Sequence, residues 1–119
     1  MATTIPPEGK LPLTPAVFHI LLALTDGEKH GYGIMQEVLR LTDGEMKMGP
    51  GTLYGSIKRM LEAGLIEESE ERPDPQLDDE RRRYYRITAF GERTARAEAR
   101  RMATLLNAVQ TKRLMGGTT

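Results

Sequence analysis

One segment of helix length, residues 49–66, carries the side chains best suited to binding a polyanion. Its apolar residues recur at helical spacing and predict a single buried face, formed by Leu53, Ile57, Met60 and Leu61. The residues that we expect outside this face are small, hydroxylated or basic, namely Thr52, Gly55, Ser56, Lys58 and Arg59. Hydroxyl groups near a helix N-terminus can bind phosphate, and an arginine can grip a guanine edge with two hydrogen bonds. A helix of this kind could lie close against DNA.

The same outer residues have a simpler interpretation as a solvated helix surface. Lysine and arginine are exposed in most proteins, and Thr52 could serve only as a local cap. Pro50 suits the first turn of a helix and Gly64 suits its end, so the helix itself is well defined. The choice between the two interpretations therefore depends on the elements around it.

A second basic run, at residues 81–83, follows an acidic stretch. Residues 67–80 contain eight acids and one base. Residues 82–88 alternate as a strand, and with the apolar pair at 65–66 they predict a two-stranded wing. The arginines of the run would supply affinity for phosphates that falls steeply with salt. The adjacent acids, Asp78, Asp79 and Glu80, could instead pair with them in the free protein, and both interpretations can hold.

Helices are expected on both sides of these segments. Residues 14–15, Thr-Pro, predict the start of a first, strongly apolar helix. A second helix enters at residues 30–33 and ends at residues 42–44, and residues 45–48 are expected to form a short strand. From residue 89 the pattern is helical to near Met115.

The last helix has apolar residues at intervals of four and three, which is typical of helix pairing. This row consists of Ala95, Ala99, Met102, Leu106 and Val109. A helix of this length exceeds what so small a domain can cover, so we expect it to pack against a second copy. It could also line an apolar pocket together with the first helix. The candidate pocket residues are Phe18, Met102, Leu106 and Val109.

Several classes of chemistry are excluded by the composition. The chain has no cysteine, so disulfides and cysteine-type zinc sites are ruled out. His19 and His30 have no clustered carboxylates beside them, and no nucleophile–base pair or phosphate-binding glycine loop occurs. We therefore expect no metal, no cofactor and no enzymatic activity. No apolar run is long enough to span a bilayer and no signal peptide is visible, which favours a cytoplasmic protein.

Four segments, in order, resemble the PadR family of bacterial transcriptional regulators. They are HGYGI at 30–34, GTLYGSI at 51–57, LEAGLI at 61–66 and RRYYRITAFG at 82–91. The resemblance covers about residues 13–92. It implies a homodimeric winged helix-turn-helix regulator, usually a repressor. Its third helix would enter the major groove, and its wing would lie along the DNA backbone or in the minor groove.

The resemblance also bears on individual residues. It implies phosphate contacts from the hydroxyls of Tyr32 and Tyr54, although either could be a core tyrosine. The short C-terminal part resembles a compact branch of the family that dimerises through the last helix and the N-terminal one. Two departures are the acidic wing and the absence of Trp, which some compact relatives use to stack planar drugs.

These observations predict a mainly α fold with a small β-wing: a winged helix-turn-helix with a long C-terminal dimerisation helix. We expect a flexible tail at 1–12, a DNA-binding domain at 13–88 and the dimerisation helix at 89–115. The expected DNA contacts are Tyr32, Thr52, Tyr54, Ser56, Lys58, Arg59, Arg81, Arg82 and Arg83. The expected partners are double-stranded DNA, a second copy and, as an open option, a small apolar effector, but no membrane. The alternatives are a winged-helix protein-interaction module and a small-molecule sensor with a pocket at the dimer interface.

Overall fold

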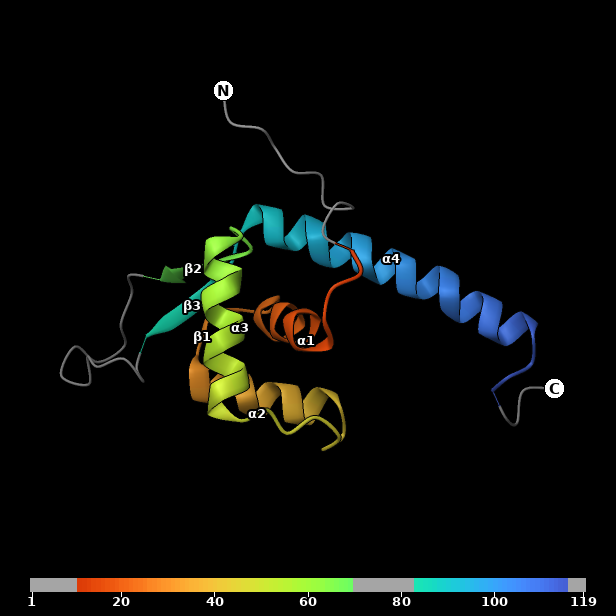
Figure 1. The fold of residues 1–119 in the computed structure, drawn as a ribbon, viewed down its shortest axis with the longest axis horizontal. Helices are drawn as coiled ribbons and strands as arrows, with labels where there is room; N and C mark the ends of the chain where they lie inside the picture. The colour runs from red at the N-terminus through yellow and green to blue at the C-terminus, as the bar shows by residue number, and fades with distance from the viewer. Residues whose placement is uncertain (1–10, 70–82, 116–119) are drawn as a thin grey trace, which may run out of the picture.

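Three helices and a small sheet form the body of the protein, and a fourth helix extends beyond it (Figure 1). This computed structural model describes residues 11–69 and 83–115. The helices are α1 (Pro15–Leu24), α2 (Gly31–Leu41), α3 (Pro50–Glu62) and α4 (Ala89–Thr111). The strands are β1 (Lys29–His30), β2 (Ile66–Ser69) and β3 (Tyr84–Ile87). The prediction of a mainly helical fold with a small wing is confirmed.

The helix starts follow from local chemistry. Thr14, His30 and Thr88 precede α1, α2 and α4, and each side chain accepts a hydrogen bond from the N–H three residues further on. These bonds measure 3.0–3.2 Å and satisfy N–H groups that have no partner inside the helix. Helix α3 has no side-chain cap and begins instead with Pro50, whose ring lacks an N–H.

The three strands form one antiparallel sheet in the order β1-β3-β2. The expected strand at residues 45–48 is wrong, because this segment is irregular: the Thr42 hydroxyl accepts the Met46 N–H over 3.0 Å, and Met48 turns into the core. The third strand is β1, where Lys29 pairs with Tyr85. Two residues are too few to show the alternation that marks a strand in sequence.

Helix α1 lies at the centre of the body and contacts α2, α3, α4 and β3. Its side chains Ile20, Leu21 and Leu24 are buried, as its apolar sequence predicts. The stripe predicted on α3 is confirmed for Leu53, Ile57 and Met60, which are at most 2% exposed, while Leu61 is half-buried against the core. The core further contains Ile34 and Val38 of α2, Leu65, Ile66 and Tyr85.

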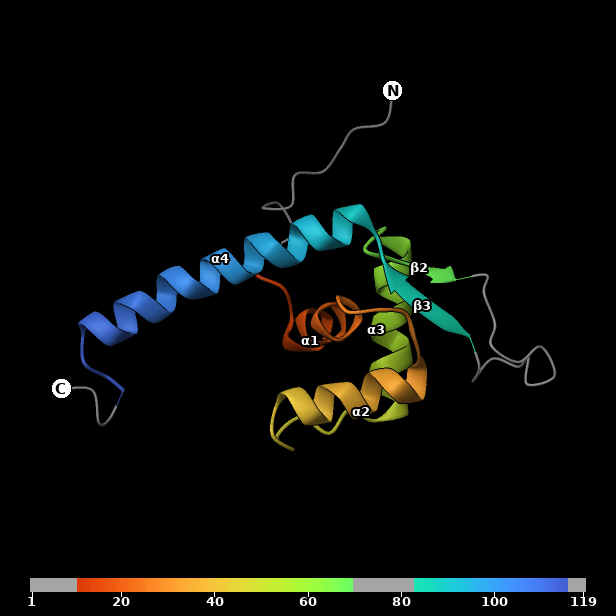
Figure 2. The same cartoon turned by 180° about the vertical axis from the view of Figure 1, so that it is seen from behind.

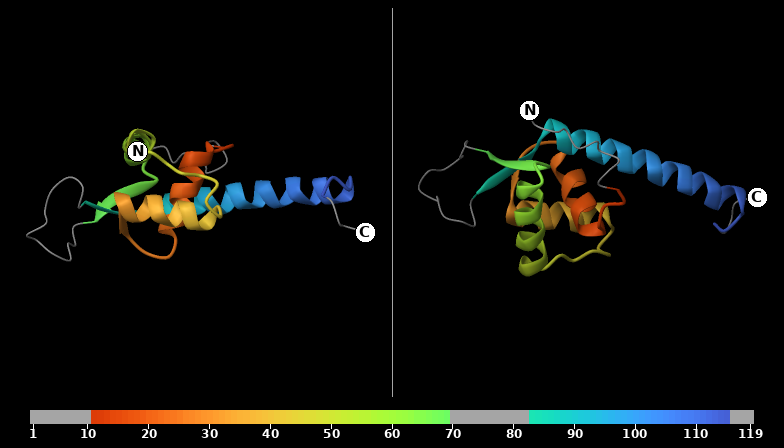
Figure 3. Two further views of the ribbon diagram at one scale, coloured as in Figure 1. Left: turned by 90° about the horizontal axis from the view of Figure 1, so that it is seen from below. Right: turned by 45° about the horizontal axis from the view of Figure 1, so that its top comes forward.

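Helix α4 has two halves with different surroundings. Its first half packs on the body, where Gly91, Thr94 and Glu98 are buried. From Ala99 to Thr111 its residues are exposed except for Val109, which is half-buried. Seen from behind and from below, this second half projects away from the rest of the molecule (Figures 2 and 3). Within the described residues, no helix has the length and apolar character needed to cross a bilayer.

Candidate nucleic-acid interface

The outermost line of α3 combines small, basic and acidic residues. Gly51, Gly55, Lys58 and Glu62 recur at intervals of four, three and four, which places them opposite the buried stripe. Lys58 and Glu62 are exposed, and a Cβ added at Gly51 would meet nothing within 4 Å. The start of this line is therefore free of side chains, so a duplex could approach the backbone closely. Thr52 is also exposed, one residue to the side.

Ser56 does not belong to this outer surface, which corrects the sequence prediction. Its side chain is 0% exposed, and its hydroxyl accepts a hydrogen bond from Arg59 Nη2 over 3.3 Å. Ser56 lies three residues after Leu53 and four before Met60, so the helix turns it toward the core. It can hold Arg59 in place but cannot reach DNA itself.

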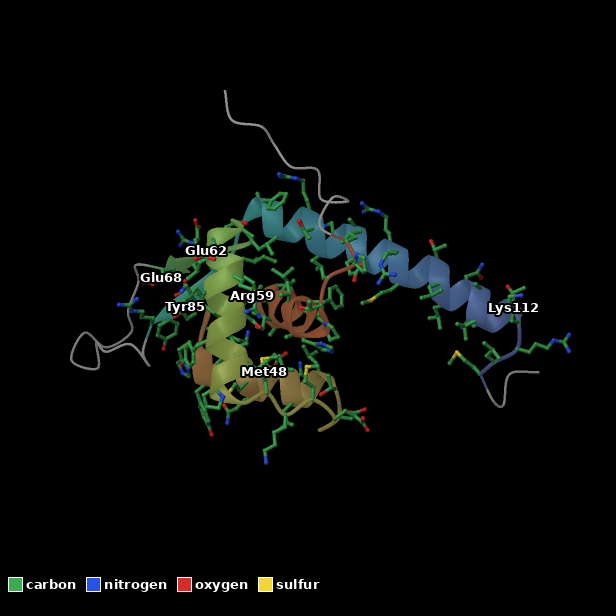
Figure 4. The ribbon with its side chains drawn as sticks, viewed as in Figure 1. Met48, Arg59, Glu62, Glu68, Tyr85 and Lys112 are labelled. Atoms are coloured by element: carbon green, nitrogen blue, oxygen red, sulfur yellow. The ribbon has the colours of Figure 1, made fainter. Side chains whose placement is uncertain are left out.

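Arg59 lies on the side of α3 that faces α1 (Figure 4). Its exposed side chain borders an open hollow of about 210 Å³, together with Leu13, Val17 and Met60. It therefore flanks the outermost line marked by Lys58. Of the two basic residues on α3, Lys58 points most directly away from the body.

The N-terminus of α2 brings a group of rings beside α3. His30 stacks on Tyr32, with ring centroids 6.5 Å apart, and meets the edge of Tyr84 on β3 at 5.3 Å. Tyr32 is 59% exposed, so it is a surface tyrosine and not a core one. Tyr54 of α3 is 36% exposed, and its hydroxyl rests on Gly31, where a Cβ would overlap it. Both predicted tyrosines thus lie on one continuous surface.

The wing holds its described arginines in cross-strand ion pairs. Arg83 Nη1 lies 3.1 Å from a Glu68 carboxylate oxygen, and Arg86 Nε lies 2.7 Å from one of Glu67. All four side chains remain partly exposed. Charge pairing of the wing arginines is therefore present, but these acids come from β2. Arg81 and Arg82, and the acids at 78–80 proposed as their partners, lie outside the described residues.

One basic residue near this surface was missed by sequence reasoning. Lys47 is exposed in the segment before α3 and borders a hollow of about 260 Å³ with Tyr32, Gln36 and Met48. Lys47 lies just ahead of Gly49 and Pro50, where the predicted recognition helix begins. This position in the sequence could have indicated that Lys47 lies beside the DNA-facing surface. The mistaken strand assignment at 45–48 obscured it.

The free half of α4 presents an apolar surface. Met102, Leu105 and Leu106 are 38%, 57% and 47% exposed, and Leu22 of α1 is 39% exposed. Ala95 is wrong as a dimerisation residue, because it is 8% exposed and belongs to the core of its own subunit. Ala99 remains exposed and Val109 half-buried. The two hollows described above include none of the predicted pocket residues, Phe18, Met102, Leu106 and Val109.

Comparison with known proteins now decides the family. Residues 20–97, about two thirds of the chain, match the model of the "Transcriptional regulator PadR-like family". The chain belongs to the PadR-like family. Like the other members of this family, it has the fold of a transcriptional regulator.

Individual relatives agree with this assignment. A transcriptional regulator from Clostridium thermocellum shares 26% identity with this PadR-like chain, with a TM-score of 0.67 over 84% of this chain and 90% of that one. A PadR family regulator from Clostridium difficile shares the fold at 22% identity, with a TM-score of 0.68 over 82% of this chain and 97% of that one. Bacillus subtilis PadR, solved in complex with operator DNA, also shares the fold. Its identity is 20% and its TM-score is 0.60, over 72% of this chain and 47% of that one.

A curated relative is much longer than the matched part. An uncharacterized 37.1 kDa protein in a Streptomyces fradiae transposon is 33% identical over 86 residues. These residues make up 72% of the PadR-like chain and 22% of that protein. The chain therefore spans about a fifth of the length of this relative.

The role of His30 in this PadR-like protein can be tested by separating its capping hydrogen bond from the contacts of its ring. His30→Asn keeps a good helix cap but loses the ring, whereas His30→Ala loses both. We expect both variants to weaken DNA binding similarly, because the ring packs against Tyr32. His30→Ala should also lower the free energy of unfolding by about 1 kcal/mol more than His30→Asn. Urea denaturation and fluorescence anisotropy measure the two effects; equal stability of the variants would contradict the capping role.

The wing acids lead to a second prediction. Replacing Glu67 and Glu68 together with Gln removes the ion pairs Arg86–Glu67 and Arg83–Glu68 and two negative charges from the wing. We expect affinity for duplex DNA of arbitrary sequence to rise about fivefold at low salt, equivalent to about 1 kcal/mol. Glu92→Gln on α4 is the control for the loss of one negative charge away from the wing. A titration in which both proteins bind alike would rule out masking by these acids.

Proposed function

We propose that this chain is a homodimeric DNA-binding regulator, a repressor that binds a near-palindromic operator. The observation that carries the proposal is the surface made by α3, the N-terminus of α2 and the wing. It combines the exposed Lys58, the hydroxyls of Thr52, Tyr32 and Tyr54, and a helix start open enough for a duplex. Family membership supports transcriptional regulation as its purpose.

In this proposal α3 reads base edges in the major groove. Lys58 faces the groove directly, while Arg59, held by Ser56, reaches it from the side that faces α1. Tyr32, Tyr54 and Lys47 bind phosphates, and the arginines at 81–83 bind the backbone beside the wing. Residues 13–88 act as the reading domain, and the part of α4 after Glu98 acts in dimerisation.

The dimer is proposed from the free half of α4. Several neighbouring apolar side chains are exposed there, including Leu105 and Leu106, and a second copy would cover them. Two copies related by a two-fold axis would present two α3 helices to successive turns of the duplex, about 34 Å apart. A small apolar effector between α4 and α1, near Phe18 and Met102, would release DNA by changing this distance.

A gel shift with DNA from upstream of the gene itself, repeated at several salt concentrations, tests the proposal. We expect a specific complex that survives competitor DNA and weakens steeply with salt. Arg59→Ala should weaken specific binding more than non-specific binding. Absence of binding even at low salt would favour a winged-helix module that binds another protein. The wing, whose described arginines are paired with acids, would suit such a partner.

A further inference from the structure

A carboxylate is buried where α4 leaves the body of the protein. Glu98 is 0% exposed, although ionisable side chains are rarely buried unless they are paired. It is also the last buried residue of α4, since the helix beyond it is exposed apart from the half-buried Val109. The carboxylate therefore lies at the junction between the packed half of the helix and the free half.

Both oxygens of this carboxylate are engaged. Oε2 accepts the backbone N–H of Leu13 over 3.1 Å, across 85 residues of sequence. Arg101 donates from Nε to Oε1 over 2.6 Å and from Nη2 to Oε2 over 3.1 Å. The hydrogen bond from Arg101, aided by that from Leu13, lowers the pKa of Glu98 below its usual range. The group is thus a carboxylate held from two sides.

The two partners belong to different parts of the fold. Leu13 directly precedes Thr14, the cap of α1, and its side chain packs on the core. Arg101 lies one turn further along α4, where its side chain is 41% exposed and shields the carboxylate. Through the Leu13 hydrogen bond, Glu98 ties the exit of α4 to the entry of α1, and Arg101 holds the carboxylate from within α4.

The other buried side chains near this junction are small. The buried neighbours Ala95 and Ala97 have small side chains. Thr94, one turn earlier, is also buried, yet its hydroxyl has no hydrogen-bond partner among the described residues. The hydrogen bond from the Leu13 N–H to Oε2 is therefore a directional contact between α4 and the residues before α1, while Arg101, on α4 itself, holds the carboxylate that accepts it.

We propose that Glu98 is a positioning residue that fixes the angle of the free half of α4 against α1. It thereby sets the separation of the two α3 helices in the dimer. This inference rests on the proposed function, because that separation exists only when two copies pair through α4. A purely structural role for Glu98 would change stability without changing this distance.

The separation of the two α3 helices can be measured with spin labels, because the chain has no cysteine of its own that would also be labelled. A spin label on Glu62→Cys, exposed at the end of α3, reports the separation between subunits by double electron–electron resonance. The first variant is Glu98→Gln, which removes the charge of the buried carboxylate. The second is Arg101→Gln, which removes the arginine that pairs with it; this variant should fold, because Arg101 is partly exposed. Arg100→Gln is the matched control, because Arg100 is the exposed neighbour outside this group of hydrogen bonds.

We expect one narrow distance distribution in the unsubstituted background and in Arg100→Gln, and a broadened or shifted one in Glu98→Gln and Arg101→Gln. Binding to an inverted repeat of the preferred spacing should fall about tenfold in the latter two, because a changed separation no longer fits both half-sites. Distributions as narrow as the control, with the same mean, would overturn the positioning role while leaving the dimer intact. Absence of any intersubunit signal would overturn the proposed dimer, and the positioning role with it.

Discussion

Gly91→Ala should lower the free energy of unfolding by about 3 kcal/mol, the upper part of the range for overfilled sites. A Cβ at this position would overlap the carbonyl oxygen of Leu65 and come within 2.8 Å of Ile87 Cγ1. The Leu65 carbonyl cannot easily move aside, because its oxygen already accepts hydrogen bonds from the backbone N–H and the hydroxyl of Thr88, each over 3.0 Å. The first turn of α4 would have to lift away from the start of the wing.

The matched control for this prediction is Gly51→Ala in the first turn of α3. A Cβ there would meet nothing within 4 Å, so this variant should be as stable as the wild type or slightly more so. Urea denaturation followed by circular dichroism compares the two variants. Equal midpoints would mean that α4 is not docked on Leu65 as described.

Leu106→Glu should separate the dimer and weaken operator binding by about 100-fold. The charge would be buried in the proposed interface without a partner, which is strongly unfavourable. A single subunit would then bind only one half-site and lose the gain that comes from linking two binding events. Sedimentation and fluorescence anisotropy on the same duplex measure the two effects.

Asn107→Glu is the control for Leu106→Glu. It adds the same charge to the next residue of α4, about 100° around the helix from Leu106 and outside the apolar row. We expect this variant to stay dimeric and to bind DNA as the wild type does. If Leu106→Glu were also dimeric, the free half of α4 would not be the interface.

The helices were predictable because each has strong local signals. The Thr-Pro pair at 14–15 and the proline at 50 mark helix starts. Four family segments at the right intervals then fixed the order of elements. By contrast, β1 consists of two residues and forms only because it pairs with the edge of β3. A pairing between distant residues leaves no pattern in the local sequence.

The individual site residues were harder to predict, for physical reasons. Ser56 is small enough to be buried once its hydroxyl is bonded, so its polarity misled the assignment of faces on α3. Ala95 is in phase with the apolar row of α4, but the close docking of Gly91 brings that first turn against the body. The pairs of Glu67 and Glu68 depend on the register between β2 and β3, which sequence does not reveal.

Selection of randomised duplex DNA by the purified protein tests the central claim most directly. Sequencing the bound DNA and measuring the mass of the complex give the recognised motif and the number of chains on it. The account predicts an inverted repeat with half-site centres about 10 base pairs apart, bound by two chains. Sequences without enrichment, or a single half-site bound by one chain, would contradict it.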